Sequence, residues 1–93
     1  MADYIKDPDA VLDYGVDWSP WLETGETIST SEWTASPDGL TVMDEPAPGM
    51  SGTSTLVWLS GGVAGRTYRV TNRITTTAGR IDERSIEIRV RER

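Results

Sequence analysis

The segment from Gly61 to Arg91, GGVAGRTYRVTNRITTTAGRIDERSIEIRVR, constrains the fold of this chain more than any other part of it. Side chains alternate with period two along two runs in this segment. One face of the first run carries Tyr68, Val70, Asn72 and Ile74, and one face of the second carries Ile86, Ile88 and Val90. Such alternation, with β-branched residues, is typical of strands that are buried on one side only. Because the Ala78-Gly79 step is a turn signal, the segment predicts an antiparallel hairpin with one face in a core.

The pairing of these two strands can also be predicted. A slip of one residue would turn the apolar side chains of one strand outward, so even-numbered residues must face even-numbered ones. A three-residue loop over 77–79, with Gly79 in the left-handed region, satisfies this requirement. The predicted cross-strand pairs are Val70–Ile86, Tyr68–Ile88, Arg73–Glu83 and Arg69–Glu87. The next allowed register would set Arg69 against Arg89, and like charges that face each other destabilise a sheet.

The length of 93 residues predicts one domain. The chain contains no cysteine, so disulfides and thiolate chemistry are excluded, which suits a reducing cytoplasm. No apolar run approaches the length of a membrane span, and the N-terminus, MADYIKDPDA, has no signal-peptide core. We therefore expect a chain that is made in the cytoplasm and has no contact with a membrane.

Charge is distributed unevenly along the chain. Residues 1–50 carry a net charge of −10 and residues 51–93 a net charge of +4, within a total of −6. This net acidity argues against a nucleic-acid partner, which would require a cationic surface. Two interpretations of the asymmetry stay open. Acidic and basic strands can be neighbours in one fold, or the acidic surface of one copy can meet the basic surface of the next.

Outside the hairpin, the sequence predicts further strands over residues 10–18, 28–34, 40–43 and 55–59. In the first of these, the even-numbered residues should face the core. Residues 1–9 are expected to form an N-terminal arm, because Asp7-Pro8 interrupts regular structure, and residues 10–93 are expected to form the domain. The run SPDG at 36–39 has the signature of a type I turn, and residues 44–54 predict a long irregular loop.

Six to seven short strands with turns between them predict an all-β domain, either a sandwich or a small barrel. The spacing of Gly65, Tyr68 and Val70 resembles the tyrosine corner of immunoglobulin-like sandwiches, where a tyrosine near the start of the penultimate strand bonds to backbone upstream. In that arrangement Trp33 or Trp18 would fill the centre of the core. We therefore expect an immunoglobulin-like antiparallel β-sandwich.

Short runs over nearly the full length carry a family resemblance. They are DPDAVLDY at 7–14, VDW at 16–18, Ile28 with WT at 33–34, WLSGG at 58–62, Gly65, Tyr68, VTN at 70–72, ITT at 74–76, AGR at 78–80 and RS at 84–85. As a set they resemble the small immunoglobulin-like proteins that tailed bacteriophages of Gram-negative hosts encode among their head and tail genes. The resemblance implies a virion structural protein at the head–tail (neck or adaptor) region or on the capsid surface. It implies no catalytic residue and no cofactor.

The residues themselves give little support for catalysis or metal binding. The chain has no histidine, and its serines have no base near them in the sequence. The paired carboxylates Asp7/Asp9, Asp13/Asp17 and Asp44/Glu45 would need a cleft to act as an acid and a base. A calcium site on the loops would need a spaced acidic-Gly pattern, which is missing. We expect a solvated acidic face, no enzyme, no cofactor and no metal.

The four tryptophans are many for a chain of this size. Two or three can fill a core, and an exposed one marks a protein interface or a sugar-binding platform. Trp21 follows Pro20 at a turn and is the one most expected to be exposed, and Trp58 has the parity opposite to Val57. The expected partner contacts are Tyr4, Ile5, Trp21, Trp58, Arg89 and Arg91.

Two functional classes follow. The first is a structural subunit of a virion that packs in several copies, or as a homo-oligomer, against capsid, connector, tail or fibre proteins. The second is a free adhesive immunoglobulin-like module that binds a carbohydrate or a cell surface. Because such adhesive modules are usually fused to other domains, the first class is preferred.

Overall fold

A computed structural model describes residues 3–45 and 47–92 of the chain. It contains eight strands: β1 (Tyr4–Lys6), β2 (Leu12–Asp17), β3 (Ile28–Ser36), β4 (Leu40–Val42), β5 (Gly49–Met50), β6 (Ser54–Gly61), β7 (Thr67–Thr76) and β8 (Ile81–Val90). The described residues form no helix, and so none that could cross a membrane. The predicted all-β fold is therefore confirmed, and the strand count exceeds the expected range because β1 and β5 are very short.

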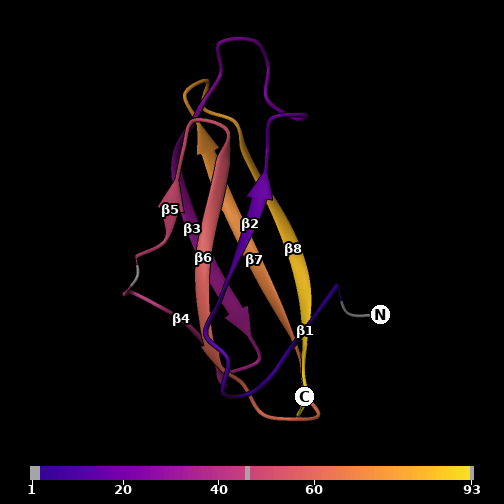
Figure 1. The fold of residues 1–93 in the computed structure, drawn as a ribbon. Helices are drawn as coiled ribbons and strands as arrows, with labels where there is room; N and C mark the ends of the chain where they lie inside the picture. Colours follow the sequence, from indigo (N-terminus) through magenta and orange to yellow (C-terminus); the bar gives the residue numbers. More distant parts are fainter. Residues whose placement is uncertain (1–2, 46, 93) are drawn as a thin grey trace.

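The strands form two facing sheets (Figure 1). Sheet A has the order β1-β8-β7-β3, and sheet B has the order β2-β6-β4 with β5 also paired to β6. The long hairpin of β7 and β8 lies at the centre of sheet A, and β6 is the central strand of sheet B. Side chains therefore alternate between the core, which lies between the sheets, and the two outer faces.

The predicted register of the hairpin is confirmed. Val70 pairs with Ile86 and Tyr68 with Ile88, and the charged pairs Arg73–Glu83 and Arg69–Glu87 lie directly opposite each other on the outer face. Gly79 has a φ of 83°, in the left-handed region, as the three-residue loop requires. The backbone N–H of Thr76 donates to the carbonyl of Arg80 across this loop at 2.8 Å.

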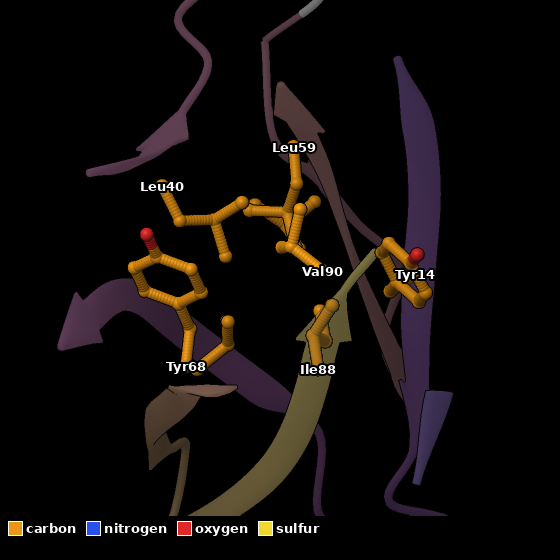
Figure 2. Packing of buried hydrophobic residues seen from close by; sticks show 8 residues of the cluster. Tyr14, Leu40, Leu59, Tyr68, Ile88 and Val90 are labelled. Atoms are coloured by element: carbon orange, nitrogen blue, oxygen red, sulfur yellow. The ribbon is translucent and has the colours of Figure 1, made fainter. Parts of the chain in front are cut away.

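The larger core cluster lies between the middle of sheet A and sheet B (Figure 2). Its fully buried members include Tyr68, Val70 and Leu59. The hydroxyl of Tyr68 accepts a hydrogen bond from the backbone N–H of Val63 at 3.0 Å, so the expected bond from the tyrosine to upstream backbone is present. A Cβ on Gly39 would lie 2.7 Å from this hydroxyl, so a glycine is needed where the chain passes over the ring.

A second buried cluster contains Trp18, Ile28 and Ile74. Trp18 is completely buried, whereas Trp33 is partly buried and packs against the larger cluster. Of the two tryptophans expected at the centre, each therefore contributes to a different cluster. Trp18 also bonds to Asn72, which lies inside the sandwich among apolar neighbours.

The N-terminal segment departs from the expected arm. Residues Tyr4–Lys6 form β1 and pair in parallel with β8, so the sandwich begins before residue 10. Lys6 is completely buried, and its ammonium group donates to the carbonyl of Gly61 at 2.7 Å and to that of Asp7 at 2.9 Å. These bonds explain how a lysine can be enclosed, because its polar end finds backbone acceptors while its stem covers apolar surface.

Smaller differences concern two other segments. Leu12 was expected on the core face of its strand but is 40% exposed, because it begins a strand at the edge of sheet B. Within the predicted loop at 44–54, Gly49 and Met50 form β5 against β6. The turn at residues 37–39 is present and contains a cis Ser36-Pro37 peptide bond.

Candidate functional site

The six expected partner contacts lie in three separate places. Ile5, Arg89 and Arg91 lie at the end of sheet A where both termini are found (Figure 1). Trp58 lies on the outer face of sheet B, and Trp21 follows β2 near the opposite end of the molecule. Tyr4 belongs to the same strand as Ile5 but has the opposite parity. The structure therefore does not bring these residues into one site.

The terminal end of sheet A presents an apolar side chain next to two arginines. Ile5 pairs with Arg89 and is 44% exposed. The backbone N–H of Arg91 donates to the carbonyl of Lys6 at 2.9 Å, which keeps this exposed residue beside β1. Tyr4 contacts the ring of Tyr14 edge-on, with 5.0 Å between the ring centres, and remains 43% exposed.

Beneath this end, burial lowers the pKa of Lys6, and the negative charges of Asp7 and Asp9 partly oppose the effect. The lysine acts as a clamp between β1 of sheet A and the end of β6 in sheet B, because its ammonium group bonds to the carbonyl of Gly61. Sequence reasoning missed this role. The sequence carried no clear signal for it, because a strand of three residues is too short to show a period.

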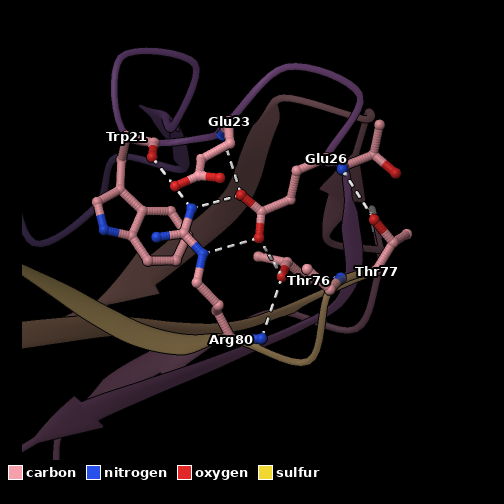
Figure 3. A network of polar contacts seen from close by, with 8 residues as sticks. Trp21, Glu23, Glu26, Thr76, Thr77 and Arg80 are labelled. Atoms are coloured by element: carbon pink, nitrogen blue, oxygen red, sulfur yellow. Dashed lines mark hydrogen bonds and ion pairs between the residues drawn. The ribbon is translucent and has the colours of Figure 1, made fainter.

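The opposite end carries a polar network around Glu26 (Figure 3). The carboxylate of Glu26 is 4% exposed and forms an ion pair with Arg80. It also accepts hydrogen bonds from the hydroxyl of Thr76 at 2.6 Å and from the backbone N–H of Glu23 at 3.0 Å. The hydrogen bond from Arg80, followed by those from Glu23 and Thr76, lowers the pKa of Glu26 to about 2.

Trp21 is part of this network and is less open than the sequence suggested. The guanidinium group of Arg80 lies 4.0 Å from the centre of the Trp21 ring and also donates to the Trp21 carbonyl at 3.3 Å. On its other side, Trp21 packs edge-on against Trp18 with 5.6 Å between the ring centres. The ring is therefore partly buried between a cation and another ring, and its observed contacts fix the loop that carries Glu26.

A shallow hollow of about 270 Å³ adjoins the network and is lined by Glu23, Thr24, Gly25, Glu26, Thr77, Ala78 and Arg80. The carboxylate of Glu26 already binds Arg80, so it offers little to a further cation. Among residues 3–45 and 47–92, no three acidic side chains come together in a way that could hold a metal ion. The acids that line the hollow are Glu23, which is exposed, and Glu26, whose carboxylate is held by Arg80.

The outer face of sheet B has a different character. Trp58 lies on this face beside Asp13, its partner on β2, and is partly exposed. Asp13 and Asp17 are exposed on the same face of β2. They are separated by about 13 Å at roughly 3.3 Å per residue, whereas glycosidase carboxylates are roughly 5–10 Å apart. The estimated separation of this pair therefore exceeds that range.

Comparisons with known proteins agree with this picture. A family model described as "Podophage GP4 fiber-tail adaptor protein gp77" matches residues 6–89. Among solved structures, the solution structure of the PKD domain from KIAA 1837 protein is similar, with a TM-score of 0.59 and 17% identity, over 99% of this chain and 82% of that one. At this identity the likeness shows the fold alone, an immunoglobulin-like sandwich. No curated protein sequence matches the chain significantly.

Proposed function

Since the chain belongs to the family of the podophage GP4 fiber-tail adaptor protein gp77, a family of phage virion structural proteins, we propose that it joins fibres to the tail of a podophage particle. The observation that carries this proposal is the family match, which spans residues 6–89 and therefore nearly the whole sandwich. In this role the chain binds other virion proteins and carries out no reaction.

The shape of the domain supports such a role. An adaptor must present at least two separate surfaces, one for each partner, on a body that keeps them in a fixed relation. The sandwich has two outer faces on opposite sides, and the buried side chain of Asn72 links the strands between them. The expected contact residues are distributed over both sheets and not collected in one cleft.

The proposal includes several copies in each particle, because fibres are attached around a tail and each attachment needs its own adaptor. A single contact can then be weak, since many copies on one particle act together. The acidic composition of the chain favours protein partners over the nucleic acid inside the particle.

The outer face of sheet A argues against the adhesive alternative. Carbohydrate-binding platforms rely on exposed aromatic rings. The described residues on this face are threonines, serines, charged residues and isoleucines, and none of them is aromatic.

Purified virions provide the test. We expect mass spectrometry to detect the protein in washed particles, and cryo-electron microscopy to place it at the junction of tail and fibre. Particles from a phage with the gene deleted should lack fibres, and added purified protein should restore their attachment. Absence of the protein from washed virions would overturn the structural role. A position on the neck or capsid, with fibres still attached in the deletion, would overturn the fibre–tail assignment alone.

A further inference from the structure

Two glycines flank Leu56 on the outer face of sheet B, and we call this position the notch. This residue lies on the central strand β6 and pairs with Gly15 on β2 and with Gly49 on β5. Neither glycine has a positive φ, so neither is required by the backbone conformation. A Cβ on Gly49 would lie 3.4 Å from the Cβ of Leu56, and one on Gly15 would lie 3.1 Å from the carbonyl oxygen of Thr55 and 3.7 Å from the Cδ1 of Leu56. Side chains at these positions would cover Leu56, and the glycines leave it accessible from both sides.

The rim of the notch is apolar on one side. Trp58 is the next residue of β6 on the same outer face as Leu56. The backbone N–H of Met43 donates to the carbonyl of Trp58 at 3.0 Å. Leu56, Trp58 and Met43 are all partly exposed. A partner side chain that sits over Leu56 would therefore contact the edge of a tryptophan, and a central aromatic anchor of this kind is typical of the strongest contributions to protein interfaces.

The charged side chains of β2, β4, β5 and β6 and of residues 44–45 are all acidic, although Arg84 of β8 reaches Asp17 from sheet A and donates to its carbonyl at 3.2 Å. Asp13 and Asp17 lie on β2 on either side of Gly15, and both are exposed. Asp44 and Glu45, also exposed, follow Met43 at the end of β4. The four strands β2, β4, β5 and β6 contain no lysine or arginine. Hydrogen bonds from the side chain and backbone of Ser19 lower the pKa of Asp17, so this carboxylate stays charged well below neutral pH.

We propose that this notch binds an extended, basic segment of a neighbouring virion protein, with an apolar side chain over Leu56 and a lysine or arginine opposite each of Asp13 and Asp17. Charge complementarity selects the partner, because the face would repel an acidic surface. In an extended chain, residues four apart are separated by about 13 Å, the same as the two aspartates. The segment therefore carries two basic residues at that spacing with an apolar residue midway. The inference rests on the proposed adaptor role and deepens it.

The other surfaces fit this partner less well. The outer face of sheet A mixes acids and bases, with Arg73 between Glu32 on β3 and Glu83 on β8. Its charges are thus matched within the sheet. The terminal end with Ile5, Arg89 and Arg91 is basic and would repel a basic segment.

The experiment measures co-sedimentation of purified full-length protein with particles from the gene-deleted phage, and separately with purified fibres, at low and moderate salt. The double variant Asp13→Lys/Asp17→Lys reverses both exposed charges. It should weaken binding to one of the two probes by about tenfold or more, because like charges would then meet. Gly49→Leu should weaken the same binding by filling the notch, although it makes the face more apolar. Raising the salt should weaken wild-type binding.

The matched control is Asp38→Lys/Glu92→Lys, which makes the same change in net charge at exposed positions outside the strands. It should bind both probes as wild type does, and thermal melts should show that all three variants are folded. Binding of Asp13→Lys/Asp17→Lys equal to that of the control, or wild-type binding that is insensitive to salt, would overturn the proposal while leaving the adaptor role intact. Wild-type protein that binds neither probe would overturn the adaptor role itself. Self-association that is lost only in Asp13→Lys/Asp17→Lys would assign the notch to a second copy and also overturn the proposal.

Discussion

Asn72 is buried between the sheets and connects several elements through its side-chain amide. Its oxygen accepts hydrogen bonds from the indole N–H of Trp18 at 2.9 Å and from the hydroxyl of Thr55 at 2.6 Å. Its nitrogen donates to the hydroxyl of Ser31 at 2.8 Å and to the carbonyl of Glu32 at 3.1 Å. A polar group in this position is tolerable because all its bonds are made, and it specifies how the two sheets are aligned.

Replacing this residue should therefore cost more stability than its size suggests. Asn72→Ala leaves the Trp18 and Thr55 donors buried without an acceptor, and each such loss costs roughly 1–3 kcal/mol. We expect the free energy of unfolding, measured by urea denaturation, to fall by about 2–4 kcal/mol. The control Thr34→Ala, at an exposed position of β3, should change it by less than about 1 kcal/mol. Equal effects of the two substitutions would contradict this role of the amide.

Glu26 makes the stability of the fold depend on pH in the acidic range. Its pKa is about 2 in the folded protein, against an ordinary value of 4.5. A lowered pKa in the folded state means that the stabilisation is complete above pH 4.5 and is lost as the pH falls towards 2. The melting temperature of wild type should fall through this window. Glu26→Gln should melt at a lower temperature at pH 7 and show a smaller fall below pH 4.5. An unchanged pH profile in this variant would exclude Glu26 as a source.

At the scale of elements, the hairpin and β1 show which pairings a sequence reveals. The register of β7 and β8 could be predicted, because a tight loop joins them and parity and charge both restrict the pairing. No such local signal existed for β1. It is a three-residue strand that pairs in parallel with a strand more than eighty positions away, and three residues are too few to show a period.

Parity and distance along the sequence also explain which surface features could be predicted. Trp58 was placed correctly on the face opposite to Val57 by parity, and β6 confirms this. The notch beside it could not be predicted, because it depends on Gly15 and Gly49 coming together from two distant strands. Trp21 was expected to be exposed, but Arg80 from the end of the β7–β8 loop covers it.

The structure of β1 changes the expected effect of removing residues 1–9. From the sequence, this deletion would remove an arm and leave the domain intact. In the structure it removes an edge strand, the buried Lys6 and the Tyr4 ring that covers Tyr14. We now expect the deletion to lower the free energy of unfolding by about 2 kcal/mol or more. Ile5→Ala, which truncates an exposed side chain on β1, should leave stability within about 1 kcal/mol of wild type.

The deletion of residues 1–9 and Ile5→Ala also separate an effect on folding from an effect on binding to a partner. If Ile5 touches a partner, Ile5→Ala should incorporate poorly into particles although it is stable, and circular dichroism melts together with particle loading would show both properties. Full stability of the deletion would mean that β1 contributes nothing to the sandwich. Normal loading of Ile5→Ala would remove Ile5 from the set of partner contacts.

At the scale of the whole molecule, the two core clusters should unfold together. β7 supplies Tyr68 and Val70 to the larger cluster and Ile74 to the smaller one, so neither cluster can open without disturbing this central strand. Asn72 lies on β7 between the two contributions and bonds to Trp18 of the smaller cluster. An adaptor that connects two partners needs this coupling, because a body that opened at one end would not keep its two surfaces in a fixed relation.

We therefore expect one cooperative unfolding transition, with a slope of about 1–2 kcal/mol per molar urea for a domain of this size. Amide NMR signals of Tyr68 and Ile74, which report on the two clusters, should disappear at the same urea concentration. Tryptophan fluorescence and far-UV circular dichroism should give the same midpoint. Refolding should take milliseconds to seconds, because the pairing of β3 with β7, of β2 with β6 and of β1 with β8 joins strands that are distant in the sequence. Loss of the Ile74 signal at lower urea than the Tyr68 signal would show that the end with Trp18 and Glu26 opens separately, and the sandwich would then not act as one rigid body.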